Sequence, residues 1–163
     1  MRPATLAKTA AGVLATAVIG GLASPPAQSS WYAELTKPSF QPPRQAFPIV
    51  WPLLYADIAV VSASTVDQLS DDGRSGYRSG EARTYSALLA LNLVLNGAWS
   101  WLFFNRRLLG TSAIAAAALT ASSAELTRRS IAVRGTPAVP LALYPLWCAF
   151  ATALSSRIWS LNR

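Results

Sequence analysis

The chain of 163 residues is 52% apolar and 13% charged, which is about half the charged share of an ordinary soluble domain. It has no histidine and one cysteine, Cys148, which excludes Ser-His and Cys-His catalysis, an intrachain disulfide and the usual zinc sites. A net charge of +7 is typical of nucleic-acid-binding proteins, but here the arginines lie at or beyond the ends of apolar stretches, so we expect no nucleic-acid partner and no metal site.

Five apolar stretches follow one another along the chain, over residues 4–23, 46–66, 84–104, 108–127 and 137–159. Each has about 20 residues, enough for a helix to cross a hydrocarbon core of roughly 30 Å. The mean hydropathy of +0.31 is modest because the stretches are rich in Ala, Ser and Thr, which membrane helices tolerate where they pack together. We therefore predict an all-α, multi-pass integral membrane protein, with residues 1–163 forming one domain of five transmembrane helices.

The first stretch has two interpretations. Arg2, Lys8, an apolar core over 10–23 and the small residues around Ala23 are typical of a secretory signal peptide with a cleavage site. On that interpretation the mature protein would have four spans. We favour a retained helix, because the segment after it gives this helix a partner.

The segment between the first two stretches is rich in proline and aromatic residues. Pro38, Pro42 and Pro43 prevent a regular helix there, because proline has no backbone N–H and restricts the residue before it. The aromatic residues give the segment enough apolar area to lie on the bundle; they are Trp31, Tyr32, Phe40 and Phe47. It is either an aromatic belt at the membrane interface or a lid over a pocket between helices.

Three polar residues of the third stretch share one helix face. Asn92, Asn96 and Ser100 follow one another at intervals of four, with Trp99 beside them. Such groups either hydrogen-bond neighbouring membrane helices or orient the polar groups of a flat ligand in an aromatic pocket. Both interpretations are open from the sequence.

Two acidic residues fall within the stretches. Asp57 lies in the second stretch, where an ionised carboxylate is costly, so we expect it to face another helix or a polar patch of the pocket. Glu125 lies near Arg128 and Arg129 at the end of the fourth stretch, where we expect an interfacial ion pair.

Three sequence blocks carry a resemblance to a known family. Trp31 to Tyr55 match the pattern W-Y-x-x-L-x-K-P-x-[WF]-x-P-P followed by V-W-x-x-L-Y, residues 95–104 match L-N-x-x-W-S-x-L-F-F, and a third block runs from Trp147 to Asn162. In order and in spacing, the chain strongly resembles the TspO/MBR family of tryptophan-rich sensory proteins and translocator proteins, which includes the peripheral benzodiazepine receptor. The resemblance covers nearly the whole chain.

The resemblance implies a compact five-helix bundle that binds tetrapyrroles, and in some lineages sterols, beneath the loop after the first helix. It also implies a homodimer. The residues at the matching pocket positions are Tyr32, Pro42, Trp51, Asn96, Trp99, Ser100, Trp147 and Ala151. Asn92 extends the helix face of Asn96 and Ser100 and is included with them. Two departures concern the last helix. Leu143 replaces a proline that is frequent in the family, which shifts the expected kink, and Ser155 and Ser156 replace the tyrosine of a proposed sterol motif, which lowers the expectation of tight sterol binding.

Two functions are compatible with this site. The first is binding and transport of protoporphyrin IX or haem, with sterol-like or other lipids as further ligands and no required cofactor. The second is a light- and oxygen-dependent breakdown of bound porphyrin, in which Trp51 and Trp147 would react with the excited macrocycle, together with a role in stress sensing. We favour binding and transport, because the sequence has no general base, nucleophile or metal constellation. Small residues in the fourth stretch, Ala113, Ala117 and Ala121, would pack inside the bundle or form a dimer seam.

Overall fold

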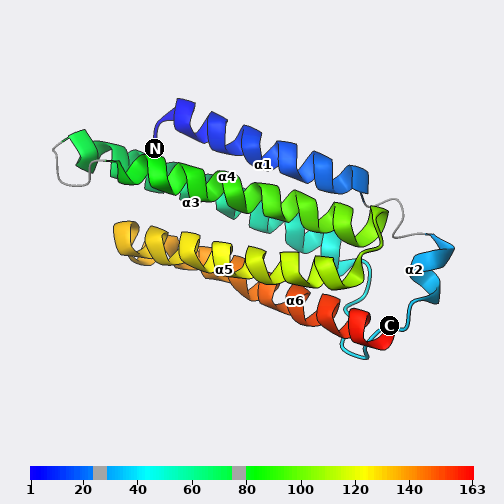
Figure 1. The fold of residues 1–163 in the computed structure, drawn as a ribbon. Helices are drawn as coiled ribbons and strands as arrows, with labels where there is room; N and C mark the ends of the chain where they lie inside the picture. The colour runs from blue at the N-terminus through cyan, green and yellow to red at the C-terminus, as the bar shows by residue number, and fades with distance from the viewer. Residues whose placement is uncertain (24–28, 75–79) are drawn as a thin grey trace.

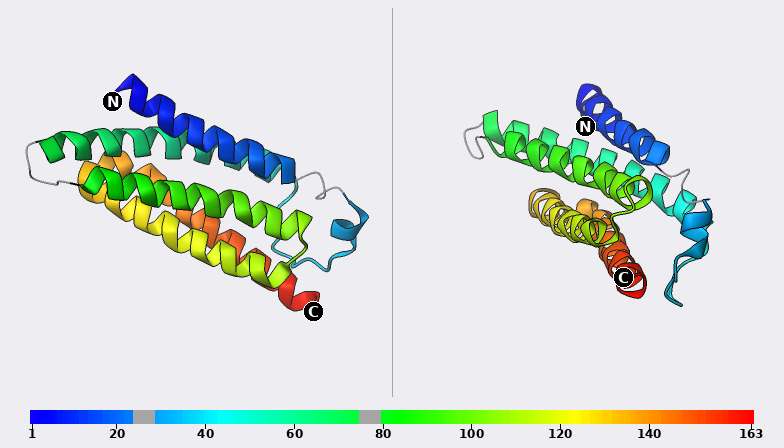
Figure 2. Two further views of the ribbon diagram at one scale, coloured as in Figure 1. Left: turned by 45° about the horizontal axis from the view of Figure 1, so that its top comes forward. Right: turned by 45° about the vertical axis from the view of Figure 1, so that its right-hand side comes forward.

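The computed structural model describes residues 1–23, 29–74 and 80–163, and every regular element in these ranges is helical (Figure 1). The elements in chain order are α1 (Pro3–Ala23), α2 (Ser30–Glu34), α3 (Ala46–Arg74), α4 (Glu81–Ser100), the π-helix η2 (Trp101–Asn105), α5 (Leu109–Arg134), the 3₁₀-helix η3 (Thr136–Ala142) and α6 (Leu143–Leu161). The long helices run side by side, and the short α2 lies across one end of the bundle (Figures 1 and 2).

All five predicted stretches are helical, and four of the resulting helices are long and apolar enough to cross a membrane. These four are Pro3–Ala23, Ala46–Gly73, Glu81–Asn105 and Thr136–Leu161. The predicted stretch 108–127 forms α5, which has 26 residues but is less apolar than the other four because of its many Ala, Ser and Thr residues and its charged last turns. Length and composition therefore support four spans directly.

The bundle has two distinct ends (Figure 1). We call the end that carries α2, the connection 35–45, η2 and the last turn of α6 the loop end. The opposite end, which we call the far end, carries the start of α1, the end of α3, the start of α4 and the end of α5. All sequence-predicted site residues lie in the half toward the loop end or near the middle of the bundle.

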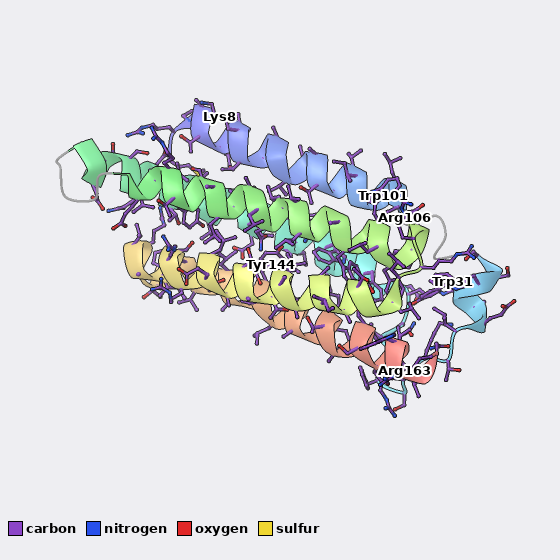
Figure 3. The ribbon with its side chains drawn as sticks, in the orientation of Figure 1. Lys8, Trp31, Trp101, Arg106, Tyr144 and Arg163 are labelled. Atoms are coloured by element: carbon purple, nitrogen blue, oxygen red, sulfur yellow. The ribbon has the colours of Figure 1, made fainter. Side chains whose placement is uncertain are left out.

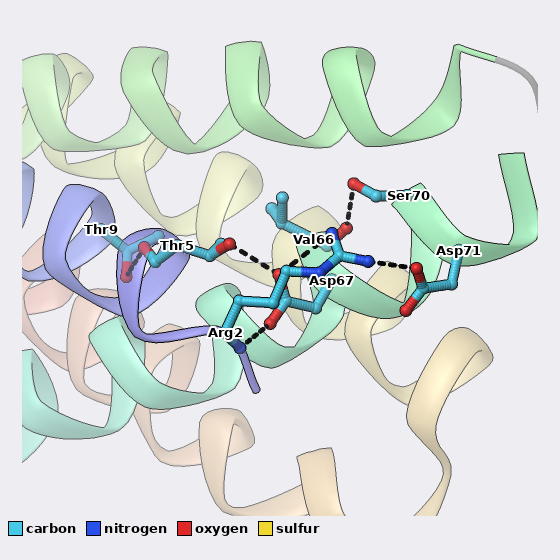
Figure 4. A network of polar contacts seen from close by, with 7 residues as sticks. All are labelled: Arg2, Thr5, Thr9, Val66, Asp67, Ser70 and Asp71. Atoms are coloured by element: carbon cyan, nitrogen blue, oxygen red, sulfur yellow. Dashed lines mark hydrogen bonds and ion pairs between the residues drawn. The ribbon is translucent and has the colours of Figure 1, made fainter. Parts of the chain in front are cut away.

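Helix α1 is fastened to α3 at the far end by a polar network around Asp67 (Figure 4). The backbone N–H of Arg2 and the Thr5 hydroxyl donate to the Asp67 carboxylate, the latter at 2.6 Å, and the Arg2 guanidinium pairs with Asp71. Asp67 is 6% exposed, so these partners provide the hydrogen bonds that water would otherwise donate to its carboxylate. One turn further on, the Thr9 hydroxyl donates to the Ala59 carbonyl at 3.1 Å.

At the loop end, α1 is held by the α4–η2 helix. The indole N–H of Trp101 donates to the Ile19 carbonyl at 3.0 Å, and the Asn105 amide donates to the Ala23 carbonyl at 3.0 Å. The bond to Ala23 satisfies one of the last four carbonyls of α1, which have no partner within their own helix. The π-helical turn that carries both donors is a local widening of the kind often found at functional positions.

The last helix begins later than its apolar stretch. Pro137 and Pro140 lie in the 3₁₀-helix η3, and the α-helix proper begins at Leu143. At the other end of this helix, Trp159 packs on the start of α5, where a Cβ atom on Gly110 would lie 3.0 Å from the indole ring. A glycine at position 110 therefore allows α5 and α6 to approach closely.

Candidate functional site

A chain of side-chain hydrogen bonds crosses four helices in the middle of the bundle. The Tyr55 hydroxyl of α3 donates to Asn96 Oδ1 at 3.0 Å, and Asn96 Nδ2 of α4 donates to the Tyr144 hydroxyl at 3.1 Å. Tyr144 of α6 donates to Asn92 Oδ1 at 2.8 Å, and Asn92 Nδ2 donates to the Ser122 hydroxyl of α5 at 3.2 Å. Tyr144 lies midway along the bundle (Figure 3).

This network accounts for two of the predicted site residues. Asn92 and Asn96 are buried and bond to neighbouring helices, as the first interpretation of their face predicted. Sequence reasoning missed Tyr144, which is fully buried and bonds to both asparagines, and it did not count Tyr55 as a site residue. A tyrosine inside an otherwise apolar span was the available signal, since a buried hydroxyl needs a partner.

Trp51 of α3 and Trp147 of α6 each belong to a group of aromatic contacts. The Trp51 ring stacks on Tyr55, with centroids 5.3 Å apart and planes 31° apart. Trp147 contacts Phe47 at 5.8 Å and Phe150 at 5.5 Å. Both tryptophans are half-buried and pack against the main apolar core. The structure thus connects Trp51 to Asn96 through a single intervening side chain, Tyr55.

Tyr32 belongs to a second aromatic cluster at the loop end. Its ring lies 6.3 Å from Phe103 and 5.8 Å from Phe104, and Phe103 in turn lies 5.9 Å from Trp99. The Trp99 indole N–H donates to the Ser155 hydroxyl of α6 at 3.3 Å. Tyr32 lies in α2, a short helix that begins after Ser29, whose hydroxyl accepts from the Tyr32 backbone N–H. The proline pattern had predicted only a loop here.

The connection after α2 lies over α6. Phe40 contacts Phe150 at 6.3 Å, in addition to the contact between Phe47 and Trp147. Asn162, directly after α6, bonds to the same connection. The Thr36 N–H donates to Asn162 Oδ1 at 2.9 Å, and Asn162 Nδ2 donates to the Thr36 carbonyl at 2.9 Å. These contacts place the segment as a cover over the end of the bundle.

The remaining predicted site residues are less concentrated. Pro42 lies in the connection and Ala151 in α6, both half-buried. Ser100 is directed toward α1, because a Cβ atom on Gly20 would lie 3.5 Å from its hydroxyl oxygen. The structure therefore does not bring Ser100 to the same face as Asn92. Asp57, which we expected to face a partner, has one buried carboxylate oxygen, Oδ2, with no hydrogen-bond partner among the described residues.

The charges divide sharply between the two ends. The chain has seven acidic residues: five lie at the far end, namely Asp67, Asp71, Asp72, Glu81 and Glu125, while Asp57 lies within α3 and Glu34 lies at the loop end. Glu125 pairs with Arg128 at 2.7 Å and with Arg129 at 2.6 Å, which confirms the ion pair predicted there. The loop end carries six basic residues, which we call the loop-end cations: Lys37, Arg44, Arg106, Arg107, Arg157 and Arg163.

Three of the loop-end cations lie over aromatic rings (Figure 3 labels Trp31 and Arg163). Lys37 Nζ is 4.7 Å from the centroid of the Tyr32 ring, Arg107 lies 5.1 Å from Trp31, and Arg163 lies 4.9 Å from Trp159. None of the six pairs with a carboxylate in the part of the chain that the structure describes. Their charges are thus held in place without being neutralised.

A hollow of about 340 Å³ lies at the far end, away from these residues. Its lining residues are Leu69, Glu81, Tyr85, Arg128, Arg129, Ala132 and Val133. Its only aromatic wall is Tyr85, whose hydroxyl bonds Ser62 and Ser130, and its arginines are already paired with Glu125. A flat aromatic ligand needs more apolar wall than this, so we place the candidate site at the loop end.

Comparison with known proteins assigns the chain to a family. The profile of the TspO/MBR family matches residues 9–160. The chain belongs to the TspO/MBR family. It is therefore an integral, multi-pass membrane protein, in agreement with its four apolar helices of spanning length.

Individual relatives come from both animals and bacteria. The translocator protein of Bos taurus is 36% identical over 135 residues, which cover 82% of this chain and 75% of that protein. The tryptophan-rich protein TspO of Chlorobaculum tepidum is 31% identical over 161 residues, covering 97% of this chain and 96% of that protein. The human translocator protein is 30% identical over 132 residues, covering 81% and 75%. TspO/MBR members of similar length thus match this chain across almost its whole bundle.

Proposed function

We propose that this TspO/MBR member binds and carries tetrapyrroles, protoporphyrin IX or haem, in a site beneath the connection 35–45. The observation that carries the proposal is the stacking of Trp51 on Tyr55 at 5.3 Å, with the Tyr55 hydroxyl bonded to Asn96. This arrangement offers a flat aromatic surface beside a polar group, which is what a large planar ring with polar substituents requires. Relatives named translocator protein support a role in carrying a ligand.

The proposed site lies between helices α3, α4 and α6. Trp147, Phe47 and Phe150 provide further aromatic surface, and Tyr32 and Pro42 belong to the cover. Ala151 is small and half-buried on α6, so it leaves room where a larger side chain would fill the space. Sterol-like or other lipids are further candidate ligands, since the walls are predominantly apolar.

The proposed bundle has five transmembrane helices, α5 included. Three polar side chains along α5 bond to other helical segments: Ser122 accepts from Asn92, Thr120 and Thr152 bond each other at 3.0 Å, and Thr127 donates to the Leu141 carbonyl. Buried in this way, they would not meet lipid, so the low hydropathy of α5 does not prevent it from spanning. Cysteines placed at each end of α5 should react with a membrane-impermeant maleimide from opposite sides of sealed vesicles. Labelling of both ends from one side would contradict the fifth span.

A homodimer is proposed on the outer face of the same helix. Ala113 is buried, but Ala117, Ala121 and Ala124 are exposed and form a ridge of small residues along α5. Such ridges let two membrane helices approach closely. Oxidative cross-linking of an Ala121→Cys variant should give a covalent dimer, and a monomer under all oxidising conditions would count against this seam.

The function is tested by titrating the protein in detergent micelles with protoporphyrin IX, in darkness and then under light. Saturable quenching of tryptophan fluorescence together with a shift of the Soret band in darkness is expected. Weakening of that binding by Trp51→Ala would locate the ligand at the proposed site. Absence of saturable binding to the wild-type protein would refute the tetrapyrrole proposal.

The titration under illumination tests the alternative function, a porphyrin-degrading activity. A carrier gives a stable, reversible complex under illumination, whereas a degrading protein bleaches the Soret band faster than free porphyrin bleaches. If bleaching depends on the protein and is lost in both Trp51→Phe and Trp147→Phe, the tryptophans react with the ligand. Protein-dependent bleaching that persists in both variants would show that neither tryptophan is required for it, and bleaching no faster than that of free porphyrin would be a property of the porphyrin alone.

A further inference from the structure

The loop end holds a positive charge in place beside a buried residue, Tyr32. The Lys37 ammonium lies 4.7 Å from the centroid of the Tyr32 ring and donates to the carbonyls of Ala33 at 3.1 Å and Leu35 at 3.2 Å. An ammonium group has three N–H donors, so one remains for another acceptor. The two backbone bonds fix the position of the charge without neutralising it.

The polar edge of Tyr32 is also incompletely bonded. Its hydroxyl accepts from Gln41 Nε2 at 3.2 Å, which leaves the hydroxyl proton available to an acceptor. Gln41 Oε1 is buried and has no hydrogen-bond partner among the described residues. Exchanging the two ends of the amide would let Gln41 accept from Tyr32 but would leave its N–H₂ group unpaired instead. Either orientation leaves a polar atom that a bound molecule or water would satisfy.

Arg44 adds a second positive charge at the same place. Burial raises the pKa of the Tyr32 hydroxyl, while the hydrogen bond from Gln41 and the nearby charge of Arg44 act in the opposite direction. Arg44 follows Gln41 by three residues in the connection 35–45, which brings its exposed side chain to the same part of the loop end. Arg44 is exposed and pairs with none of the described carboxylates, so its charge has no internal counterion.

We propose that Lys37, Arg44 and the Tyr32 hydroxyl bind a carboxylate of the ligand. The inference rests on the proposed function and makes it more specific: the ligand is a planar, largely apolar molecule that carries carboxylate groups, with its ring on the aromatic side chains and its acid groups toward the loop-end cations. Charge-assisted hydrogen bonds to a carboxylate are roughly twice as strong as neutral ones, so this edge would distinguish a free acid from its ester.

The charge distribution favours a ligand carboxylate over a structural ion pair. The far end of the bundle neutralises Arg2, Arg128 and Arg129 with its own carboxylates. The loop end has one acidic residue, Glu34, in the described part of the chain, and Glu34 pairs with none of the six cations. The loop-end cations therefore have no carboxylate partner among the described residues, and a carboxylate of a bound ligand would supply one.

The test compares protoporphyrin IX, which has two carboxylates, with its dimethyl ester, which has the same ring and none. Affinities are measured by tryptophan quenching in non-ionic detergent without added lipid, for the wild-type protein and two matched double variants. Lys37→Gln/Arg44→Gln removes two charges at Tyr32. Arg83→Gln/Arg134→Gln removes two charges from the far-end halves of α4 and α5, where neither arginine pairs with a described carboxylate.

We expect the wild-type protein to bind the acid about tenfold more tightly than the ester at low salt, as for a desolvated charge-assisted pair. The Lys37→Gln/Arg44→Gln variant should bind both alike, with ester affinity unchanged, and unchanged ester binding also shows that the site is still folded. The far-end variant should keep the wild-type ratio. If the first variant loses ester binding as well, the single Arg44→Gln variant, which removes an exposed side chain, should still lower the ratio by severalfold.

Several results would overturn the inference. Equal binding of acid and ester by the wild-type protein would overturn the inference and leave the proposed function intact. A preference for the acid that both the Arg44→Gln variant and the double variant retain would have the same meaning. If the wild-type protein shows no preference for the acid but binds phosphatidylglycerol, and the Lys37→Gln/Arg44→Gln variant loses that lipid binding, the loop-end cations serve lipid headgroups. Failure of both porphyrins to bind would refute the proposed function itself, and this inference with it.

Discussion

The two ends of the bundle differ in the partners of those cations that make contacts within the chain. At the far end, Arg2 pairs with Asp67 and Asp71, and Arg128 and Arg129 share Glu125. At the loop end, the ring faces of aromatic residues take the place of carboxylates. The first arrangement stabilises the fold, since both charges belong to the chain. The second leaves a positive field next to the aromatic cover, and so serves an interaction with something else.

This contrast predicts that substitutions at the far end lower stability with little effect on ligand affinity, and that substitutions at the loop end do the reverse. Asp67→Ala should have the largest effect. It removes the acceptor of Thr5 and of the Arg2 backbone and leaves these half-buried donors without that partner, for a loss of about 2 kcal/mol. Thermal unfolding in detergent measures this loss, and porphyrin affinity should be unchanged at temperatures where the variant is folded.

The matched control is Asp71→Ala, since the Asp71 side chain is 60% exposed and its pair with Arg2 is on the surface. Surface pairs contribute roughly 0–1 kcal/mol, so this variant should lie close to the wild-type protein. Equal destabilisation by both variants would show that buried bonding at Asp67 is not what fastens α1.

Trp51→Ala is the corresponding test at the loop end. Loss of the stacking surface should weaken protoporphyrin IX binding by about tenfold, since aromatic stacking contributes about 0.5–1.5 kcal/mol beyond its buried area. Trp101→Ala is the control, because Trp101 is exposed and bonds α1 through Ile19. A similar loss of affinity in both would mean that any tryptophan of the bundle affects binding.

Gly110→Ala tests the packing beneath the loop end. The added methyl group would lie 3.0 Å from the Trp159 ring, so Trp159 or the start of α5 must move, at a cost of about 1–2 kcal/mol. Gly21→Ala is the control, since a Cβ atom there meets nothing within 4 Å. Helix propensity predicts that Gly21→Ala is neutral or slightly stabilising. Unfolding midpoints that do not separate the two variants would contradict the close contact.

Asn162→Ala should have the smallest effect on stability, a few tenths of a kcal/mol, because its bonds to Thr36 are solvent-exposed. Its effect should be kinetic: with the connection released, bound porphyrin should dissociate several times faster in a stopped-flow chase. Ser160→Ala removes only a hydroxyl bonded within α6 and should leave the rate unchanged. Identical dissociation rates for wild type and Asn162→Ala would show that the connection does not limit release.

Much of the fold could be predicted from stretch length alone, because a bilayer fixes how long an apolar helix must be. All five predicted stretches are helical, and the pairing of Glu125 with its neighbours follows from helical spacing. The partners of Arg2 could not be predicted, since they lie 65 and 69 residues away in the chain. Only the packing of α1 on α3 brings them together.

The candidate site could be predicted in part. Asn92, Asn96 and Ser100 were assigned to one face, yet each step of four residues rotates a side chain by about 40° around a helix of 3.6 residues per turn. Over two steps that rotation separates Ser100, near Gly20 of α1, from Asn92, which bonds α5 and α6. The role of Tyr144 was hidden for a related reason: its partners are on another helix, and no local pattern identifies them.

The hydrogen-bond chain through α4 also has a consequence for biosynthesis. Helix α4 is made before the helices that satisfy its amides: Ser122 follows Asn92 by 30 residues, and Tyr144 follows it by 52. During that interval Asn92 would face lipid or the insertion machinery with its amide unpaired, which hydrocarbon does not accommodate well. Helix α4 is therefore expected to stay close to the translocon until α6 has emerged. On this view α4, α5 and α6 enter the bilayer together.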